Sequence, residues 1–360
     1  MKILFALAVA LAVASPATAG YRYTTVDGPT DGAPLLGTVV TSINDSGLAT
    51  GYYVTDDGAG GPGTYTGFTV NRDGSGFASF TRAGYAQTGA AGIDNAGDIT
   101  GVSVTSLGQG TGFVRSGADG SYADIDPNLD PSFGAVSLYS EAIGINNFGA
   151  VTGYYTTDPA ATVGTLAQYA HGFIEYGGVY TQVDVDPLDG YGTQVTSIND
   201  LGLFTGTYLD NSADHFSHPF IGIFEPGLGG LIISLDTDPF GAPSSSIGNI
   251  TDNLYTTYNS LYPCPCSPTG FYSAAYILDV AYGGAEPIEV PGAFFTNVFG
   301  INQSTDVTGF YYSDTGLHGF VAAWVPEPAS WLLMIAGFGL TGVMLRRRER
   351  GFAQGLVARG

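Results

Sequence analysis

Residues 145–155 read INNFGAVTGYY, and copies of this stretch recur along the chain. The isoleucines that begin the six copies are Ile43, Ile93, Ile145, Ile198, Ile250 and Ile301, at successive spacings of 50, 52, 53, 52 and 51 residues. Copies two and five depart most from the pattern, because Asp94 and Thr251 stand where the other copies have the anchor Asn. Two β-rich runs around an Asn/Asp-x-Gly turn predict a β-hairpin in each copy.

Two further runs complete each repeat. The third run contains a phenylalanine, usually after Gly, and its members are Phe68, Phe113, Phe173, Phe220, Phe271 and Phe320. A fourth run precedes the next anchor, as in residues 122–127, 180–187 and 233–239. Four short strands in about 50 residues are typical of one blade of a β-propeller.

The ends of the array predict how the propeller closes. Residues 20–325 divide into six repeats of 51 residues, and the last repeat lacks a fourth run. Residues 23–29 at the other end match residues 180–187, so an N-terminal strand would complete the last blade and remove its free edge. We therefore predict an all-β fold, a six-bladed β-propeller of four-stranded repeats closed by the N-terminal strand. A β-solenoid is the structural alternative, although solenoid repeats are usually shorter and would not need the split copy.

The charges are distributed unevenly. The 360 residues include 32 acidic and 10 basic side chains, but residues 20–325 hold 30 of the carboxylates against four arginines and no lysine, a net charge of −26. Nucleic acid is excluded as a partner, because binding to phosphates needs many Lys and Arg side chains. Such an anionic domain favours solubility outside the cell and an attraction for divalent cations.

The first 19 residues have the pattern of a secretory signal peptide. Lys2 gives a positive start, residues 3–13 are apolar, and Ala17-Thr18-Ala19 is a small-residue cleavage site. The apolar run is too short for a membrane anchor, which needs about 20 residues. We predict cleavage after Ala19 and a mature domain over residues 20–325, outside the cytoplasm.

The C-terminal end has three parts in order. They are the motif Pro326, Glu327 and Pro328, an apolar run over residues 331–345 and the cluster Arg346, Arg347, Arg348 and Arg350. Basic residues after an apolar helix stay on the cytoplasmic side, so the preceding domain should face outward. We predict a sorting tail over residues 326–350 with a short transmembrane helix, followed by an extension over residues 351–360.

This tail resembles the PEP-CTERM sorting signal of Gram-negative bacteria that make exopolysaccharide. The resemblance implies that a membrane-embedded exosortase, acting through a Cys nucleophile, recognises Pro-Glu-Pro and removes the tail during export to the cell surface or matrix. The protein would then be held in the inner membrane only transiently. Permanent anchoring by residues 332–350 is the alternative.

The repeats resemble the HAF family of extracellular repeat proteins. Residues 144–155, 171–173 and 290–292 match its Gly-Ile-Asn-Asn-x-Gly-x-Val-x-Gly-Tyr-Tyr, His-Gly-Phe and Val-Pro-Gly elements. This resemblance bears on fold and location only.

Paired carboxylates recur before a proline in three repeats. The pairs are Asp124 and Asp126, Asp184 and Asp186, and Asp236 and Asp238. Residues two apart on a strand share a face, so each pair could ligate calcium. Asp before Pro is also an ordinary turn device, and we favour the turn. No other cofactor is predicted.

The histidines, cysteines and paired tyrosines could each serve a function, but each could also have a purely structural role. His215 and His218 beside Asp214 could form a zinc site, but His218 occupies a position that His171 and His318 also hold, which favours a hydrogen-bonding role. Cys264 and Cys266 are either an oxidised or a free pair, with no function assigned to them. The tyrosine pairs 52–53, 154–155 and 311–312 could stack on sugar rings, although one of each pair should pack between blades.

The leading hypothesis is a non-enzymatic surface or matrix protein that binds polysaccharide, a divalent cation or another surface protein. The alternative is an extracellular glycan hydrolase or lyase on a propeller scaffold. Hydrolysis needs two positioned carboxylates, and no motif in the sequence provides them.

Overall fold

A computed structural model describes residues 20–30, 32–58, 63–134, 136–159, 166–185, 190–212, 215–234, 240–264 and 271–325. The chain divides into two units, one formed by Tyr23–Ala323 and one by Met1–Arg22 with Trp324–Gly360. The predicted signal peptide, sorting tail with its transmembrane helix, and C-terminal extension lie outside the described residues. In the described part, no helix is long and apolar enough to cross a membrane.

The described chain is all-β, as predicted, apart from two short 3-10 helices, η1 (Pro127–Leu129) and η2 (Leu166–Tyr169). Four sheets have four antiparallel strands each. The first of these sheets, in chain order, contains β6 (Gln87–Ile93), β7 (Ile99–Val104), β8 (Gly110–Arg115) and β9 (Tyr122–Ile125), and the second contains β10 (Tyr139–Ile145), β11 (Val151–Thr156), β12 (His171–Tyr176) and β13 (Val179–Val183). The third contains β14 (Gly190–Ile198), β15 (Leu203–Asp210), β16 (Ser217–Glu225) and β17 (Gly229–Ser234). The fourth contains β18 (Ser244–Ile250), β19 (Tyr255–Pro263), β20 (Phe271–Asp279) and β21 (Ala285–Ile288).

The fifth sheet has eight strands and joins the two ends of the array. Its strands are β1 (Gly20–Val26), β2 (Leu35–Ile43), β3 (Leu48–Thr55), β4 (Thr64–Asn71), β5 (Ala78–Phe80), β22 (Phe295–Ile301), β23 (Val307–Ser313) and β24 (Gly316–Val325). The N-terminal strand β1 pairs with β24. Strands β24 and β2 meet in parallel at one residue pair, Leu317 and Gly37.

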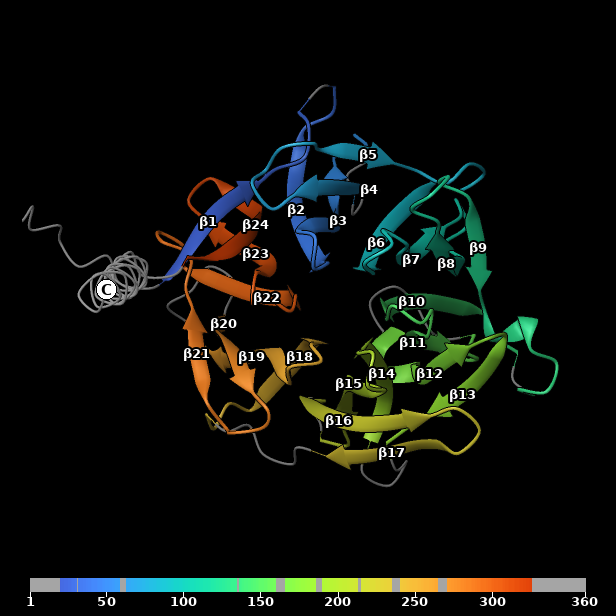
Figure 1. Ribbon diagram of the computed structural model, residues 1–360. Helices are drawn as coiled ribbons and strands as arrows, with labels where there is room; N and C mark the ends of the chain where they lie inside the picture. Colours follow the sequence, from blue (N-terminus) through green and yellow to red (C-terminus); the bar gives the residue numbers. More distant parts are fainter. Residues whose placement is uncertain are drawn as a thin grey trace, which may run out of the picture. The chain divides into compact units, whose positions relative to one another are not determined.

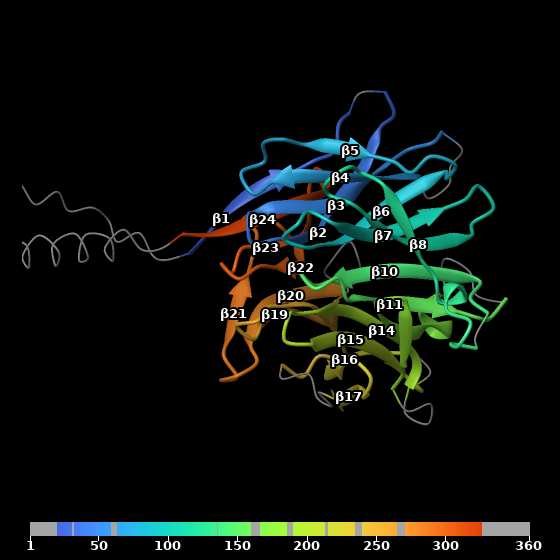
Figure 2. The same ribbon diagram turned by 45° about the vertical axis from the view of Figure 1, so that its right-hand side comes forward.

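The sheets of the unit Tyr23–Ala323 stand side by side around a central axis, as Figures 1 and 2 show. In Figure 1, the strand nearest the axis is the first of each group, β2, β6, β10, β14, β18 or β22. The turn that follows this strand is therefore the part of each repeat closest to the axis.

The anchor turns have the conformation that their sequence predicts. The glycine at the fourth turn position adopts a positive φ, for example 81° at Gly149, which costs glycine little because it has no Cβ. In copies five and six the same position holds Leu254 at 65° and Thr305 at 61°. These two copies therefore keep the turn at a steric cost.

A glycine opposite an aromatic ring forms the centre of most repeats. Gly153 on β11 pairs with Phe173 on β12, and a Cβ on Gly153 would lie 2.9 Å from the Phe173 ring and 2.0 Å from the carbonyl oxygen of Glu141. The glycine therefore lets the strand pass beneath the ring. The fully buried rings in this third-strand position are Phe68, Phe113, Phe173, Phe220 and Phe320.

The fifth repeat corrects one prediction. Phe271 was expected at the third-strand position, but it pairs with Pro263 at the end of β19. The residue at that position is Tyr276, which pairs with Tyr258. Tyr258 replaces the glycine of the other copies and is fully buried, while Tyr276 stacks on Phe240 with ring centroids 4.0 Å apart. A large side chain in place of glycine has displaced the aromatic packing of this repeat.

Candidate functional site

The six anchor residues gather around the axis and close their own turns. Asn146 Oδ1 accepts the backbone N–H groups of Phe148 and Ala150 at 3.1 and 2.9 Å. Asn44, Asp94, Asn199 and Asn302 accept the corresponding pair of bonds. Thr251 accepts one bond, from Tyr255 N at 3.1 Å. Because this role needs only an acceptor oxygen, Asp and Thr can replace Asn in it.

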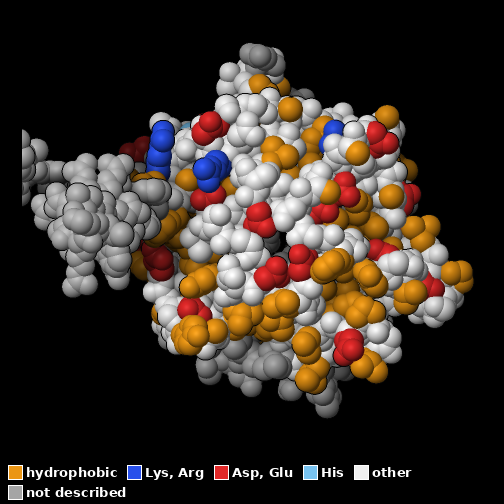
Figure 3. Space-filling view, viewed as in Figure 1, with side chains coloured by type: hydrophobic (Ala, Val, Ile, Leu, Met, Phe, Trp, Pro, Cys, Tyr) orange, Lys and Arg blue, Asp and Glu red, His pale blue; other side chains and the backbone are white. Residues whose placement is uncertain are grey.

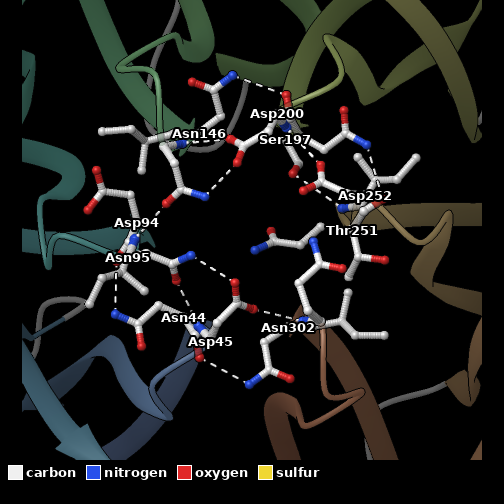
Figure 4. A pocket seen from close by; sticks show the side chains of 18 of the residues that line it. Asn44, Asp45, Asp94, Asn95, Asn146, Ser197, Asp200, Thr251, Asp252 and Asn302 are labelled. Atoms are coloured by element: carbon white, nitrogen blue, oxygen red, sulfur yellow. Dashed lines mark hydrogen bonds between the residues drawn. The ribbon is translucent and has the colours of Figure 1, made fainter.

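The anchor amide nitrogens also join neighbouring repeats (Figure 4). Each donates to the backbone carbonyl of the next anchor, from Asn44 to Asp94 (2.8 Å), from Asn146 to Asn199 (3.0 Å), from Asn199 to Thr251 (3.0 Å) and from Asn302 to Asn44 (3.0 Å). Asp94 and Thr251 have no amide to donate, so the ring of bonds is interrupted after these two residues. The two copies that depart from the sequence pattern are therefore the two that lack the hydrogen bond to the next anchor.

A second ring lies beside the first, formed by the residues that follow the anchors. Its members are Asp45, Asn95, Asn147, Asp200, Asp252 and Gln303. Backbone N–H groups donate to the side-chain oxygen of the next member at 2.8–2.9 Å in five of the six steps, Asp45 to Asn95, Asn95 to Asn147, Asn147 to Asp200, Asp200 to Asp252, and Gln303 to Asp45. This ring of hydrogen bonds also connects neighbouring repeats.

The second ring brings three carboxylates, those of Asp45, Asp200 and Asp252, to the hollow at this end of the axis, which the anchor Asp94 also lines. Figure 3 shows acidic side chains gathered around a central hollow on the same face. Burial, together with the charges of Asp200 and Asp45, raises the pKa of Asp252. One oxygen of each carboxylate already accepts a backbone N–H, which makes the ring part of the architecture.

The Asp pairs proposed as calcium ligands are only partly within the described residues. Asp186, Asp236 and Asp238 lie outside them. Asp124 forms an ion pair with Arg82, and Asp126 accepts Asn128 N at 3.0 Å as the N-cap of η1. Asp184 accepts bonds from Gln182 Nε2 at 2.6 Å and Gly172 N at 3.2 Å. In the described part of the chain, no three His, Cys, Asp or Glu side chains gather so as to hold a metal ion.

Histidines of three third strands bond to carboxylates. The pairs are His171 and Asp184 at 2.9 Å, His218 and Asp210 at 3.2 Å, and His318 and Asp27 at 2.9 Å. Each imidazole also lies against a tyrosine ring, Tyr155, Tyr208 or Tyr311, with centroids 5.2–5.4 Å apart. The hydrogen bond from the His171 imidazole to the Asp184 carboxylate raises the pKa of His171. This geometry supports the hydrogen-bonding interpretation of these histidines over a zinc site; Asp214 lies outside the described residues.

His318 belongs to a chain of three polar groups that sequence analysis missed. Its Nδ1 bonds Asp27, and its Nε2 lies 2.8 Å from the hydroxyl of Thr315. Asp27 follows β1 and His318 lies on β24, so their bond joins the N-terminal strand to the last strand of the array. The match between residues 23–29 and 180–187 aligns Asp27 with Asp184, and this was the available signal for the pair.

The tyrosine pairs divide between two environments, as strand alternation requires. Tyr53 and Tyr155 are buried in hydrophobic clusters. Tyr154 donates its hydroxyl to Glu141 Oε2 at 2.8 Å, on the opposite face of its strand. Cys264 is disulfide-bonded; Cys266 lies outside the described residues.

Comparisons with known proteins concern the C-terminal motif and the fold. A β-propeller domain of the Trilobed protease from Pyrococcus furiosus is 10% identical, with a TM-score of 0.42, covering 81% of this chain and 94% of that one. TolB from Acinetobacter baumannii is 12% identical (TM-score 0.46, 77% of this chain and 64% of that chain). A putative TolB from Agrobacterium tumefaciens is 9% identical (TM-score 0.48, 82% and 91%). At these values the likeness carries no inference about activity.

No curated protein sequence matches the chain. One family model does, over the C-terminal segment that the tripartite pattern singled out. Residues 325–348 match the PEP-CTERM protein-sorting motif, so the chain carries the sorting signal of an exported protein that is processed by an exosortase.

Proposed function

We propose that this protein is exported, cut by an exosortase and released as a cell-surface or matrix protein. The match of residues 325–348 to the PEP-CTERM motif carries the proposal. Replacing Pro326, Glu327 and Pro328 by alanine should leave an uncut form in the inner-membrane fraction, as should deletion of the host exosortase gene. Release of cut protein from both strains would contradict the proposal.

The proposed mature form is the domain over residues 20–325, after removal of a signal peptide at Ala19. We propose six blades of the HAF repeat type for it. The single parallel pair between β24 and β2 favours treating the eight-stranded sheet as two blades. The pairing of β1 with β24, together with the bond between Asp27 and His318, supports closure of the last blade by the N-terminal strand.

The proposed role of this domain is binding or structural, not enzymatic, in association with exopolysaccharide. Support comes from the use of its acidic and imidazole groups, since those of the two rings and of the His–Asp pairs are bonded within or between repeats. Incubation with the host's exopolysaccharide should give co-sedimentation without new reducing ends. Release of reducing ends would favour a glycan hydrolase or lyase instead.

We propose a turn-forming role for the Asp pairs at 124/126, 184/186 and 236/238, with calcium binding as the alternative. The bonds of Asp126 to the η1 turn and of Asp184 to Gly172 N support the turn. The thermal midpoint should then be the same in calcium and in chelator. A higher midpoint in calcium would favour the metal.

A further inference from the structure

A cavity of about 280 Å³ lies on the axis beyond the anchor turns, lined by all six repeats. It is bounded mainly by the innermost strands, with Tyr52, Thr207 and Asn259 from second strands, whereas the hollow of the two rings is bounded mainly by the turns. Asn249 lines both spaces and donates to Ser42 Oγ at 2.9 Å. Its side chain therefore stands between them. The volume is close to the lower end of the range for small-molecule sites, about 300 Å³.

Glu141 is the one acidic or basic residue among those that line this cavity. It lies on β10, paired with Tyr154. The other repeats have Val39, Gly89, Gln194, Ser246 and Asn297 at the corresponding position, opposite the second strand. A group required by the repeat architecture would recur from copy to copy, as the anchors do. Glu141 does not recur in the other copies, so the repeat architecture does not explain why a carboxylate stands at this position.

The carboxylate of Glu141 is only half satisfied. Its Oε2 accepts the hydroxyl of Tyr154 at 2.8 Å and, weakly, that of Tyr139 at 3.5 Å. No group in the described part of the chain bonds Oε1, and none of the ion pairs there includes Glu141. An enclosed carboxylate without a cation is energetically costly, because its charge has lost the surrounding water. A positive group in the cavity would offset this cost.

Other cavity-lining polar groups also lack partners. Gln194, Thr207 and Tyr52 line the cavity, and their side chains make no hydrogen bond to any residue that the structure describes. An ammonium group offers three N–H donors, which these oxygens and Glu141 Oε1 can accept. Tyr52 and Phe299 add aromatic surface, which favours an organic cation. A bare metal ion fits poorly, because calcium requires six to eight oxygen ligands.

We propose that the axial cavity binds a small primary ammonium compound, with its ammonium group against Glu141 Oε1 and its carbon body beside Tyr52 and Phe299. The strongly anionic domain raises the local concentration of such cations. The site gives a ligand class to the binding role proposed above, but it depends on neither export nor exosortase processing. Its test can therefore fail while the proposed function stands.

The test is isothermal titration of the protein isolated from its host, at pH 7.5. Ethanolamine and glucosamine are the ammonium probes, and ethylene glycol, glucose and N-acetylglucosamine are their neutral counterparts. The ammonium compounds should bind, and the neutral ones should bind at least about tenfold more weakly, a difference of about 1.4 kcal/mol. Binding of ethanolamine without glucosamine would limit the site to simple amines, which the proposal also includes. Equal binding of neutral and ammonium probes, or no binding of either, would overturn it.

Glu141→Gln is the decisive variant because it keeps the shape and an acceptor for Tyr154 while removing the charge. It should weaken ethanolamine binding at least about tenfold. The matched control is Glu175→Gln, at a buried carboxylate that accepts Gly178 N at 2.6 Å and does not line the cavity. It should leave the affinity unchanged. Equal loss in both variants would show a general effect of lost carboxylate and refute the site.

Proton linkage gives an independent readout. Burial raises the pKa of Glu141, against the two tyrosine hydroxyl bonds. The phenols of Tyr139, Tyr154 and Tyr52 face Glu141, and Tyr65 and Tyr312 lie next to Tyr52. Burial raises the pKa values of Tyr139, Tyr154 and Tyr52 above the usual range of a phenol. Glu141 is the one carboxylic acid among these groups. Affinity for ethanolamine should fall as pH is lowered from 8 to 5 in the natural protein, and not in Glu141→Gln.

Discussion

The interrupted ring of anchors makes a quantitative prediction about Asp94. Changing Asp94 to Asn supplies the missing amide donor, whose target is the carbonyl oxygen of Asn146. The same carbonyl in the next repeat, that of Asn199, accepts both the Asn146 amide and its own turn N–H. The geometry for the new bond therefore already exists. One such buried bond contributes about 1 kcal/mol to the free energy of unfolding.

The charge of Asp94 adds to this gain at neutral pH. Asp94 is 8% exposed. Burial raises its pKa most, and repulsion from the Asp98 carboxylate raises it further. Between its unfolded and folded pKa values the folded state holds more protons, so this group lowers stability as pH rises through that window. Asp94→Asn should therefore gain about 1 kcal/mol or more at pH 7. The gain should shrink at pH 4, where a protonated Asp94 can itself donate to the Asn146 carbonyl.

The reverse change provides the matched variant. Asn146→Asp keeps the acceptor for Phe148 and Ala150 but loses the donor to Asn199, and leaves a buried charge at a site that is 7% exposed. It should cost about 1–3 kcal/mol at pH 7. Urea unfolding followed by circular dichroism measures both variants. If Asp94→Asn were no more stable than the natural protein and Asn146→Asp no less, the ring would have no energetic role.

Two more stability predictions come from single repeats. Changing His171 to Asn removes the hydrogen bond to Asp184. Because that bond raises the pKa of His171, the stabilisation it gives is complete below the pKa of His171 in the unfolded chain. It declines as pH rises through the pKa of His171 in the folded protein. The variant's deficit in urea midpoint should thus be larger at pH 6 than at pH 9, and an equal deficit would refute the ionic contribution. Thr305→Gly relieves a positive φ and should raise the free energy of unfolding by up to about 1 kcal/mol, whereas Gly149→Thr should lower it; a loss in Thr305→Gly would contradict the strain.

Local sequence signals predicted the hairpins, because the Asn/Asp-x-Gly turn fixes its own geometry. The third strand of the fifth repeat is present, but the place of Phe271 in it was predicted wrongly, because the register follows the packing of Tyr258 and Tyr276, which no local signal reveals. The rings could not be predicted either, since their bonds join residues 50 to 53 apart, and 258 apart between Asn302 and Asn44.

The cavity residue Glu141 was missed for a related reason. The repeat pattern identifies positions that recur, and Glu141 has no acidic counterpart in the other copies. Whether its side chain faces the axis depends on the strand register, which shifts at an irregularity between Ala142 and Gly144. An aligned view of the six copies would show it as the one acid at its position. The departures from the repeat, at Asp94, Thr251 and Glu141, are where the structure adds most to the sequence.

The mass of the protein at the cell surface tests the central claim most directly. Intact-mass spectrometry of protein isolated from the host's surface and culture medium should give a chain that begins at Gly20 and lacks the segment from residue 331 to residue 360. A surface form that retains the arginines at 346–350 would contradict exosortase processing, and would make the C-terminal segment a permanent anchor.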